Sequence, residues 1–469
     1  MNEFNWILPE YKEERIEPYM SNQIPMFQPP SEWLPPESIP NLSDAKEIAV
    51  DLETRDEKIK ELGPGWATGE GDVIGVAVAV EGWKGYFPLK HPGGGNFDEK
   101  IFYRNFKKLM SLPNRKIFHN AMYDVGWLKQ KDIQVNGNYI DTMIAAQIID
   151  ENRMGYSLNA VAKDYLGEKK NENLLYEAAK EWGVDPKGEM FKLPAQFVGP
   201  YAEQDADLTL RLWHRLESEI YKQDLVSVFS LETNILPALI EMKWRGVRVD
   251  TSRATQIKEN LLEEENALLT KIKSISGVSV DVWAARSVAK AFDAMGIPYN
   301  RTEKAKEPKF DKNFLATHNS DLAKLVVQTR EINKARTTFI DTIMKHQKNG
   351  RIHAEIHQMK SDVGGTVTGR FSMSNPNLQQ IPARNEKIGP MIRSLFIPEE
   401  GAKWGCFDYN QQEPRLVAHY AAITRNGLEG ADKVIDGYNS DLDFHGTVAE
   451  MANIDRKIAK TINLGLFSG

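Results

Sequence analysis

Hydrophobic and polar residues change their spacing along the chain, and these changes divide it into regions with different expected elements. Apolar runs typical of strands occur at Glu47–Val50, Val73–Val80, Gly85–Leu89 and Arg115–Phe118. Helical periodicity covers Ala121–Lys129, Thr142–Ile149 and Gln204–Tyr221. Because strands and helices are interleaved, residues 44–228 are predicted to form an α/β layer domain.

A second pattern begins near residue 229. From Leu231 to Gln347 the spacing is almost wholly helical, so residues 229–349 are expected to form a helical domain. The remaining expected elements are a strand over Arg351–Gln358, turns over Gly364–Pro382, a buried strand that ends at Asp408, and helices near Arg415–Ala422 and Asp455–Leu466. We divide this last part into residues 350–425 and 426–469.

The first 43 residues differ from the rest because they are rich in proline. Six prolines lie between Pro25 and Pro40, and proline disfavours regular structure. Residues 1–43 are therefore expected to be an arm that either lies on the neighbouring domain or is loose.

Composition limits the class of protein. The chain has 469 residues, enough for two or three domains, and 41 % of them are hydrophobic, which argues against disorder. Its single cysteine, Cys406, allows no intrachain disulfide and fits a reducing compartment. No apolar run is long enough to cross a bilayer, so a soluble cytoplasmic protein is expected.

The net charge of −7 taken alone argues against a nucleic-acid partner, but phosphate is recognised by local patches. Residues 286–312 contain seven Lys or Arg against four Asp or Glu, and residues 361–397 contain four against two. On charge alone, DNA contact and ordinary solvated helix faces explain these segments equally well.

Asp51 and Glu53 are the first candidates for chemistry. Residues two apart on a strand point to the same side, so both carboxylates lie on one face of the predicted strand. Like charges this close repel and normally require a cation such as Mg²⁺ or Mn²⁺. Taken alone, the pair is more often a solvated strand edge.

Two further acidic residues, Asp124 and Asp205, strengthen the case that this pair is functional. Asn120 and Asp124 stand at a predicted strand-to-helix junction, and Tyr201 and Asp205 share one helix face. In this order and at these separations, the residues resemble the three sequence motifs of 3′-5′ proofreading exonucleases. The resemblance implies a ribonuclease H-like domain that hydrolyses phosphodiesters with two metal ions.

The resemblance also implies a role for each residue. The metal ligands would be Asp51, Glu53, Asp124 and Asp205, the Tyr201 hydroxyl would orient the attacking water, and Asn120 would contact DNA. Asp207 is the rival of Asp205, but it lies six residues from Tyr201 and falls off that helix face. A set of surface acids is the alternative.

A second constellation follows residue 360. Arg370, Asn377 and Gln379 lie in a basic, amide-rich turn segment, and such side chains can donate to the minor-groove acceptors that all correct base pairs share. Farther along, Asp408 ends a predicted strand, and Arg456 and Lys460 share a helix face that suits a triphosphate. Solvated loops and helices are the commoner origin of each segment taken singly.

Together these segments resemble family A DNA polymerases, and the similarity covers residues 45–467, with Leu231–Asp250 resembling the entry into the thumb. The resemblance implies a helical thumb and an incomplete α+β palm and fingers. Asp408 would be a palm metal ligand, and Glu413 would exclude a ribose 2′-hydroxyl. The incoming deoxynucleoside triphosphate would meet His445, Arg456, Lys460 and Leu464, and the duplex minor groove would meet Arg370, Asn377 and Gln379.

The sequence departs from the family at several positions. Leu464 stands where the family has an aromatic residue and Ser468 where it has Tyr, while Gln412 and Pro414 replace aliphatic residues. The family's second palm carboxylate is absent, and Asp408 alone should hold two ions poorly. We therefore expect the amino-terminal part of a split polymerase with a carboxyl-terminal partner chain; a truncated product or an interrupted gene is the alternative.

The resulting prediction is a DNA 3′-5′ exonuclease joined to part of a DNA polymerase, dependent on Mg²⁺ or Mn²⁺ and acting on primer-template and single-stranded 3′ ends. The resemblance also suggests a phage origin. The alternatives are a non-catalytic subunit that binds primer-template and a ribonuclease that uses the same first-domain acids.

Overall fold

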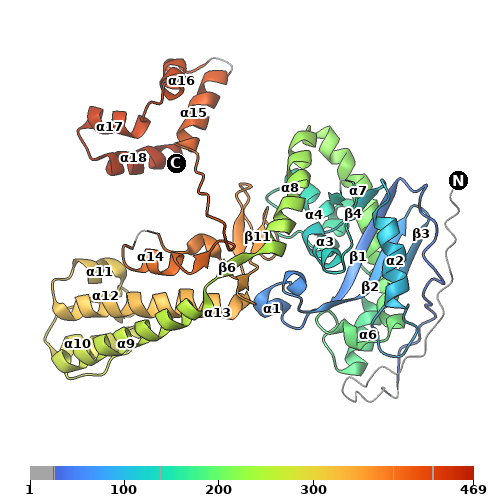
Figure 1. The fold of residues 1–469 in the computed structure, drawn as a ribbon, viewed down its shortest axis with the longest axis horizontal. Helices are drawn as coiled ribbons and strands as arrows, with labels where there is room; N and C mark the ends of the chain where they lie inside the picture. The colour runs from blue at the N-terminus through green and yellow to red at the C-terminus, as the bar shows by residue number, and fades with distance from the viewer. Residues whose placement is uncertain (1–24, 26, 138, 384, 425–426, 469) are drawn as a thin grey trace. The chain divides into compact units, whose positions relative to one another are not determined.

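The computed structural model describes residues 25, 27–137, 139–383, 385–424 and 427–468. They form two compact units that divide between Glu399 and Glu400, and each unit is described by itself (Figure 1). The first unit contains an α/β layer and a helical region, and the second unit is helical.

A five-stranded sheet organises the first 220 residues. Its strands are β1 (Glu47–Arg55), β2 (Asp72–Val80), β3 (Trp83–Pro88), β4 (Arg115–Phe118) and β5 (Tyr139–Asp141), in the order β3-β2-β1-β4-β5. Strand β2 runs antiparallel to both of its neighbours, β1 and β3, whereas β4 and β5 run parallel to β1. This mixed sheet agrees with the ribonuclease H-like layer expected from the sequence, and all four predicted strands are confirmed.

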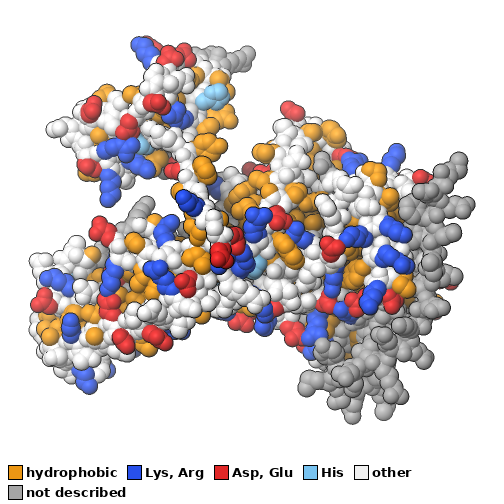
Figure 2. Space-filling view, viewed as in Figure 1, with side chains coloured by type: hydrophobic (Ala, Val, Ile, Leu, Met, Phe, Trp, Pro, Cys, Tyr) orange, Lys and Arg blue, Asp and Glu red, His pale blue; other side chains and the backbone are white. Residues whose placement is uncertain are grey.

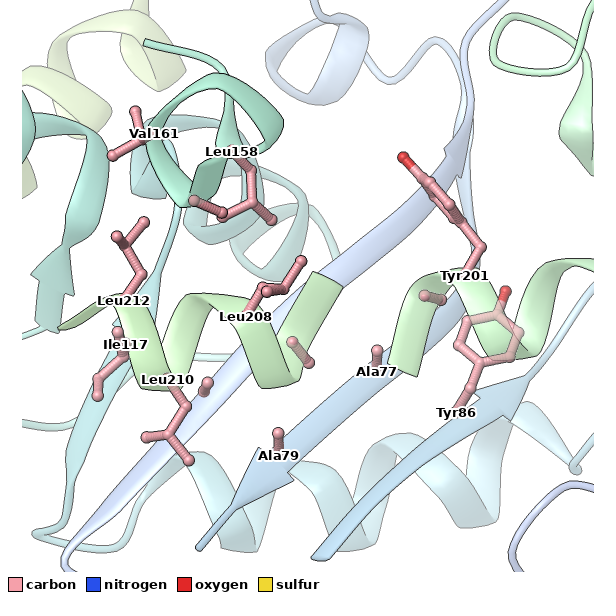
Figure 3. Packing of buried hydrophobic residues seen from close by; sticks show 14 of the residues in the cluster. Ala77, Ala79, Tyr86, Ile117, Leu158, Val161, Tyr201, Leu208, Leu210 and Leu212 are labelled. Atoms are coloured by element: carbon pink, nitrogen blue, oxygen red, sulfur yellow. The ribbon is translucent and has the colours of Figure 1, made fainter. Parts of the chain in front are cut away.

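Helices cover both faces of the sheet because its strands alternate between two cores. The helices are α1 (Ile59–Leu62), α2 (Glu99–Met110), α3 (Ala121–Gln130), α4 (Thr142–Ile149), α5 (Leu158–Leu166), α6 (Asn173–Trp182) and α7 (Ala195–Lys222). On one face, Ala49, Ala77 and Tyr86 pack with α7, as Figure 3 shows for Ala77 and Tyr86. On the other face, Val50, Val76 and Phe87 join a core with α2 and α3.

The rest of the first unit is mainly helical, as predicted. It contains α8 (Val226–Arg245), α9 (Thr251–Ser276), α10 (Ala285–Ala294), α11 (Lys312–Thr317), α12 (Asp321–Lys334), α13 (Asp341–His346) and α14 (Ile388–Arg393). A small sheet, β13-β6-β10-β9, comprises β6 (Val247–Val249), β9 (Gln347–Lys348), β10 (Arg351–Ile352) and β13 (Phe396–Ile397). Two-stranded ribbons are formed by β7 (Asn300–Arg301) with β8 (Pro308–Lys309), and by β11 (Glu355–His357) with β12 (Ser372–Ser374). The strand predicted over Arg351–Gln358 is thus divided into β10 and β11, which belong to different sheets.

Polar contacts connect the helical region and the β11–β12 ribbon with the α/β layer. The buried Lys243 of α8 forms an ion pair with Glu355 of β11, and its ammonium lies 4.4 Å from the Trp66 ring centroid. The Asp362 carboxylate, in the β11–β12 connection, accepts the N–H groups of Tyr156 at 2.8 Å and Ser157 at 3.1 Å, at the start of α5. The β11–β12 ribbon is therefore anchored to the α/β layer.

The second unit contains α15 (Gln412–Ile423), α16 (Ala431–Asn439), α17 (Phe444–Ala452) and α18 (Arg456–Ser468). Both predicted helices are confirmed. The buried strand predicted to end at Asp408 is wrong, because residues 402–409 have no regular structure and Phe407 is 97 % exposed. No strand among the described residues pairs with this segment, so its backbone groups gain nothing from an extended ladder. Apolar side chains remain exposed on this unit (Figure 2).

The described part of the amino-terminal arm lies on the α/β layer, which decides between the two alternatives for these residues. Ile39 and Leu42 are buried in the core that includes α2 and α3. Residues 1–24 and 26 lie outside the described residues. Across the described helices, none has both the length and the apolar character needed to cross a membrane.

Candidate active site

Asp51 and Glu53 lie side by side on one face of β1, as strand alternation predicts. Their partners on β2 are Ala77 and Gly75, both small. A Cβ on Gly75 would lie 1.9 Å from the Tyr86 hydroxyl, so only glycine leaves room for the Tyr86 side chain beside this face. The small partner residues on β2 thus let the Tyr86 side chain pack beside the two carboxylates.

Helix α7 brings Tyr201 and Asp205 to the same face. One carboxylate oxygen each from Asp51, Glu53 and Asp205 lies within 4.8 Å of the others. Tyr201 precedes Asp205 by about one helical turn and contributes to the buried cluster that Figure 3 shows between α7 and the sheet. The structure therefore brings together residues about 150 positions apart in the sequence. From the sequence, their proximity could be expected only through the resemblance to proofreading exonucleases.

Asp124 joins the cluster from α3. It is 3 % exposed, and its Oδ1 accepts the N–H of Leu52 at 3.0 Å, between the two acids of β1. Asn120 precedes α3 with φ of 72°, and its N–H is accepted by Asp141 Oδ1 at 3.0 Å. The left-handed turn at Asn120 thus sets the start of the helix that carries Asp124. Its contact with DNA stays a prediction.

Burial raises the pKa of all four acids, and repulsion between the acids adds to the rise for Asp51, Glu53 and Asp124. Burial, followed by the charge of Asp205, raises the pKa of Asp51 to about 7. The pKa of Glu53 and that of Asp124 lie well above their ordinary values, in both cases mainly through burial and then through Asp51. Three carboxylates within 4.8 Å of one another, with the buried Asp124 close by, favour the binding of cations.

Lys170 is a residue of this site that the sequence reasoning missed. Its Nζ lies 2.5 Å from Asp205 Oδ2, 3.4 Å from the Tyr201 hydroxyl and 5.0 Å from the Tyr201 ring centroid. Burial raises the pKa of Asp205, and the Lys170 charge opposes this rise. Lys170 follows α5 in the segment Gly167-Glu168-Lys169-Lys170-Asn171, where the sequence has the appearance of a solvated loop, so no signal in it indicated a buried lysine.

The cluster fits divalent cations. Asp205 Oδ1 is buried and has no hydrogen-bond partner among the described residues. Carboxylate oxygens are the ligands that Mg²⁺ and Mn²⁺ prefer, and a single lysine cannot neutralise four acids. Asp51, Glu53 and Asp205 can therefore hold a metal ion, and Asp124 adjoins them through the backbone of Leu52.

The minor-groove candidates of the first unit lie near β12. The Asn377 side-chain oxygen accepts the N–H of Gln379 at 3.0 Å, and Gln379 Nε2 donates to the Phe371 carbonyl at 2.9 Å. The backbone carbonyl of Arg370, just before β12, accepts the Thr366 hydroxyl at 2.7 Å. The three candidates thus flank β12, with Arg370 and Gln379 exposed and Asn377 half-buried, and their contact with duplex DNA stays a prediction.

The polymerase candidates of the second unit are distributed over its helices. Arg456 forms an ion pair with Asp443, with Nε 2.6 Å from a carboxylate oxygen. His445 is buried, with Nδ1 3.0 Å from Asn463 Nδ2, and burial lowers its pKa. The remaining candidates are Lys460, which is exposed, Leu464, which is half-buried, and Asp408 and Glu413, which are exposed.

Comparison with known proteins identifies two matching families. The model of a 3′-5′ exonuclease matches residues 34–221, and the model of DNA polymerase family A matches residues 251–469. A DNA-directed DNA polymerase of Pseudomonas phage M6 is 37 % identical over 94 % of this chain and 71 % of its own length. The DNA polymerase DpoZ of Salmonella phage PMBT28 is 30 % identical over 91 % of this chain and 70 % of its own length.

A solved structure is similar in fold. The POL domain of Pol1 from M. smegmatis, in complex with DNA primer-template and dNTP, superimposes with a TM-score of 0.68. It covers 91 % of this chain and 69 % of its own, at 20 % sequence identity.

Proposed function

We propose that Asp51, Glu53, Asp124 and Asp205 form the site of a 3′-5′ exonuclease. The chain belongs to DNA polymerase family A and carries a 3′-5′ exonuclease domain. The reaction is removal of nucleotides from DNA 3′ ends with two Mg²⁺ or Mn²⁺ ions. The observation that carries this proposal is the cluster of carboxylates, in which Asp205 Oδ1 is buried without a hydrogen-bond partner among the residues that the structure describes.

The roles proposed for Tyr201 and Lys170 follow from the groups that lie beside them. Divalent ions, when bound, supply an activated water and stabilise charge on the leaving oxygen. The Tyr201 hydroxyl, beside Asp205, accepts or donates a hydrogen bond and can orient that water. Lys170, 2.5 Å from Asp205, holds the carboxylates together when the ions are away and presents a positive charge beside the path of the phosphate.

Degradation of a 5′-labelled single-stranded oligonucleotide, with Mg²⁺, Mn²⁺ or EDTA, tests the proposal. Asp205→Asn is expected to abolish shortening, whereas the matched variant Asp207→Asn is expected to retain it, because Asp207 pairs with Arg211 at 3.1 Å outside the cluster. Equal loss in both variants, or cleavage in EDTA, would contradict the site assignment. Binding of primer-template without any shortening would favour the non-catalytic subunit instead.

The polymerase roles are proposed with the same residues as in the sequence analysis. Asp408 binds metal, Glu413 excludes the ribose hydroxyl, and primer extension depends on further palm carboxylates supplied outside the described residues by a complementary carboxyl-terminal polypeptide. Exposed apolar residues of the second unit, including Phe407 and Tyr420, support such a partner. Co-purification with that polypeptide and recovery of primer extension test this; failure of both would contradict it.

A further inference from the structure

Helix α7 contains Pro200 immediately before Tyr201. Proline has no N–H, so the carbonyl of Gln196, four residues earlier, loses its usual intrahelical donor. The Ser31 hydroxyl of the amino-terminal arm donates to this carbonyl at 2.8 Å. The arm thus supplies, at the Gln196 carbonyl, the hydrogen bond that Pro200 cannot make.

Trp33 makes a second contact with the same turn of α7. A Cβ on Gly199 would lie 2.3 Å from the Trp33 ring, so the indole packs directly on the helix backbone and only glycine allows this approach. The indole Nε1 donates to Glu203 Oε1 at 2.9 Å. Glu203 stands midway between Tyr201 and Asp205 in the sequence.

Glu203 also connects the arm with the sheet. The same oxygen, Oε1, accepts the backbone N–H of Tyr86 at 3.1 Å, and the Trp33 and Tyr86 ring centroids are 6.1 Å apart. Tyr86 on β3 pairs with Ala77 on β2, which in turn pairs with Asp51 on β1. One carboxylate oxygen therefore joins the arm, the helix of Asp205 and the row of strands that leads to Asp51.

The arm is itself held in place. Pro36 packs against Gly85, where a Cβ would lie 2.5 Å from its ring, and Ile39 and Leu42 are 5 % and 7 % exposed. Ser31 and Trp33 precede residue 34, where the match to the exonuclease family begins. Their contacts are a feature of this chain that the family match does not include.

We propose that Ser31 and Trp33 are positioning residues for the exonuclease site: they fix the first turns of α7 at Pro200 and so set the distance of Tyr201 and Asp205 from Asp51. This inference rests on the proposed function for its catalytic consequence. Loss of the contacts between the arm and α7 is expected to weaken metal binding, because metal ligands must be held within a fraction of an ångström of their positions.

The test uses four variants of the full chain. Ser31→Ala removes the donor to Gln196, Ser31→Thr keeps a hydroxyl, and Trp33→Phe keeps a ring but removes the Nε1 donor. The matched control is Leu34→Ser, since Leu34 lies on the same arm and is 82 % exposed. Mn²⁺ affinity is measured by calorimetry with Mn²⁺ alone, and amide hydrogen exchange is measured over residues 197–206.

Ser31→Ala and Trp33→Phe are expected to weaken Mn²⁺ binding about 3- to 10-fold, the effect of losing one hydrogen bond. Both should speed amide exchange over residues 197–206 and lower kcat for 3′-end removal with KM unchanged. Ser31→Thr is expected to restore all three, and the Leu34→Ser control should match the wild type.

Unchanged Mn²⁺ affinity and unchanged exchange in both Ser31→Ala and Trp33→Phe would overturn the positioning role. So would a fall in Tm without any change in exchange near Tyr201. A wild type that binds Mn²⁺ but removes no nucleotides would defeat the proposed function instead, while the exchange and affinity measurements would still decide the role of the arm.

Discussion

Replacing Asp51 by Asn is expected to stabilise the metal-free protein while abolishing its nuclease activity. Burial and the neighbouring charge of Asp205 raise the pKa of Asp51 from 3.8 to about 7. A carboxyl with a raised pKa in the fold favours folding while protonated, and this contribution is lost as the pH rises through about 7. At pH 8 without metal, the ionised Asp51 therefore opposes folding.

The size of the effect follows from this pKa. The interval from 3.8 to about 7 corresponds to ~4 kcal/mol. Asp51 is only half-buried by its surface, and repacking around Asn costs something, so we expect a gain of ~2 kcal/mol. For a domain of the size of residues 44–228, a gain of ~2 kcal/mol in unfolding free energy raises the melting temperature, Tm, by roughly 4–8 °C.

The assay is thermal unfolding in EDTA at pH 5 and pH 8, with nuclease activity in Mg²⁺ measured on the same preparations. The wild type should lose stability between the two pH values, and Asp51→Asn should lose less and unfold at the higher temperature at pH 8. Asp207→Asn is the control, since it removes an acid from α7 outside the cluster and is expected to show neither effect. A Tm for Asp51→Asn at or below that of the wild type at pH 8 would refute the account of a repulsive acidic cluster.

Other parts of the structure give further predictions. Lys243→Met should destabilise the protein by about 3–5 kcal/mol, measured by urea unfolding, because it leaves the largely enclosed Glu355, with 12 % of its side chain exposed, without its cation. The double variant Lys243→Met with Glu355→Gln should recover part of the loss. Asp362→Ala should cost ~1–2 kcal/mol through loss of two N–H partners at the start of α5, seen as faster amide exchange there. Tyr201→Phe should lower kcat by about 10²-fold with little change in Mn²⁺ affinity, and an equal loss of both would assign Tyr201 to metal binding.

The sequence allowed much of the fold to be predicted because its periods are strong. The apolar run Val73–Val80 forms β2, and the helix predicted over Thr142–Ile149 has those bounds. The prediction failed around Asp408, where an apolar segment was interpreted as a buried strand. An apolar run favours a strand only if a partner supplies the ladder, and that condition depends on the tertiary structure rather than on the run itself.

In the candidate site, too, some residues could be placed from the local sequence pattern, and others only from the tertiary structure. Asp51 and Glu53 could be placed on one face by strand alternation, whereas their meeting with Asp205 needed either the resemblance or the coordinates. Lys170 could not be found, because its burial arises from how α5 and α7 pack and not from any local pattern. The support of Ser31 for α7 is a contact over 165 positions, which no periodicity reports.

The β11–β12 ribbon has a consequence for how two activities share one molecule. One end of its connection caps α5 through Asp362 and accepts a hydrogen bond from Gln147 of α4 through the Lys360 carbonyl, and β12 leads directly into the turn of Asn377 and Gln379. A shift of this turn that moved the ribbon would strain these hydrogen bonds to α4 and to the start of α5. The turn proposed to meet the duplex is therefore tied, through a short ribbon, to the two helices that pack beside the acids of the proposed exonuclease site.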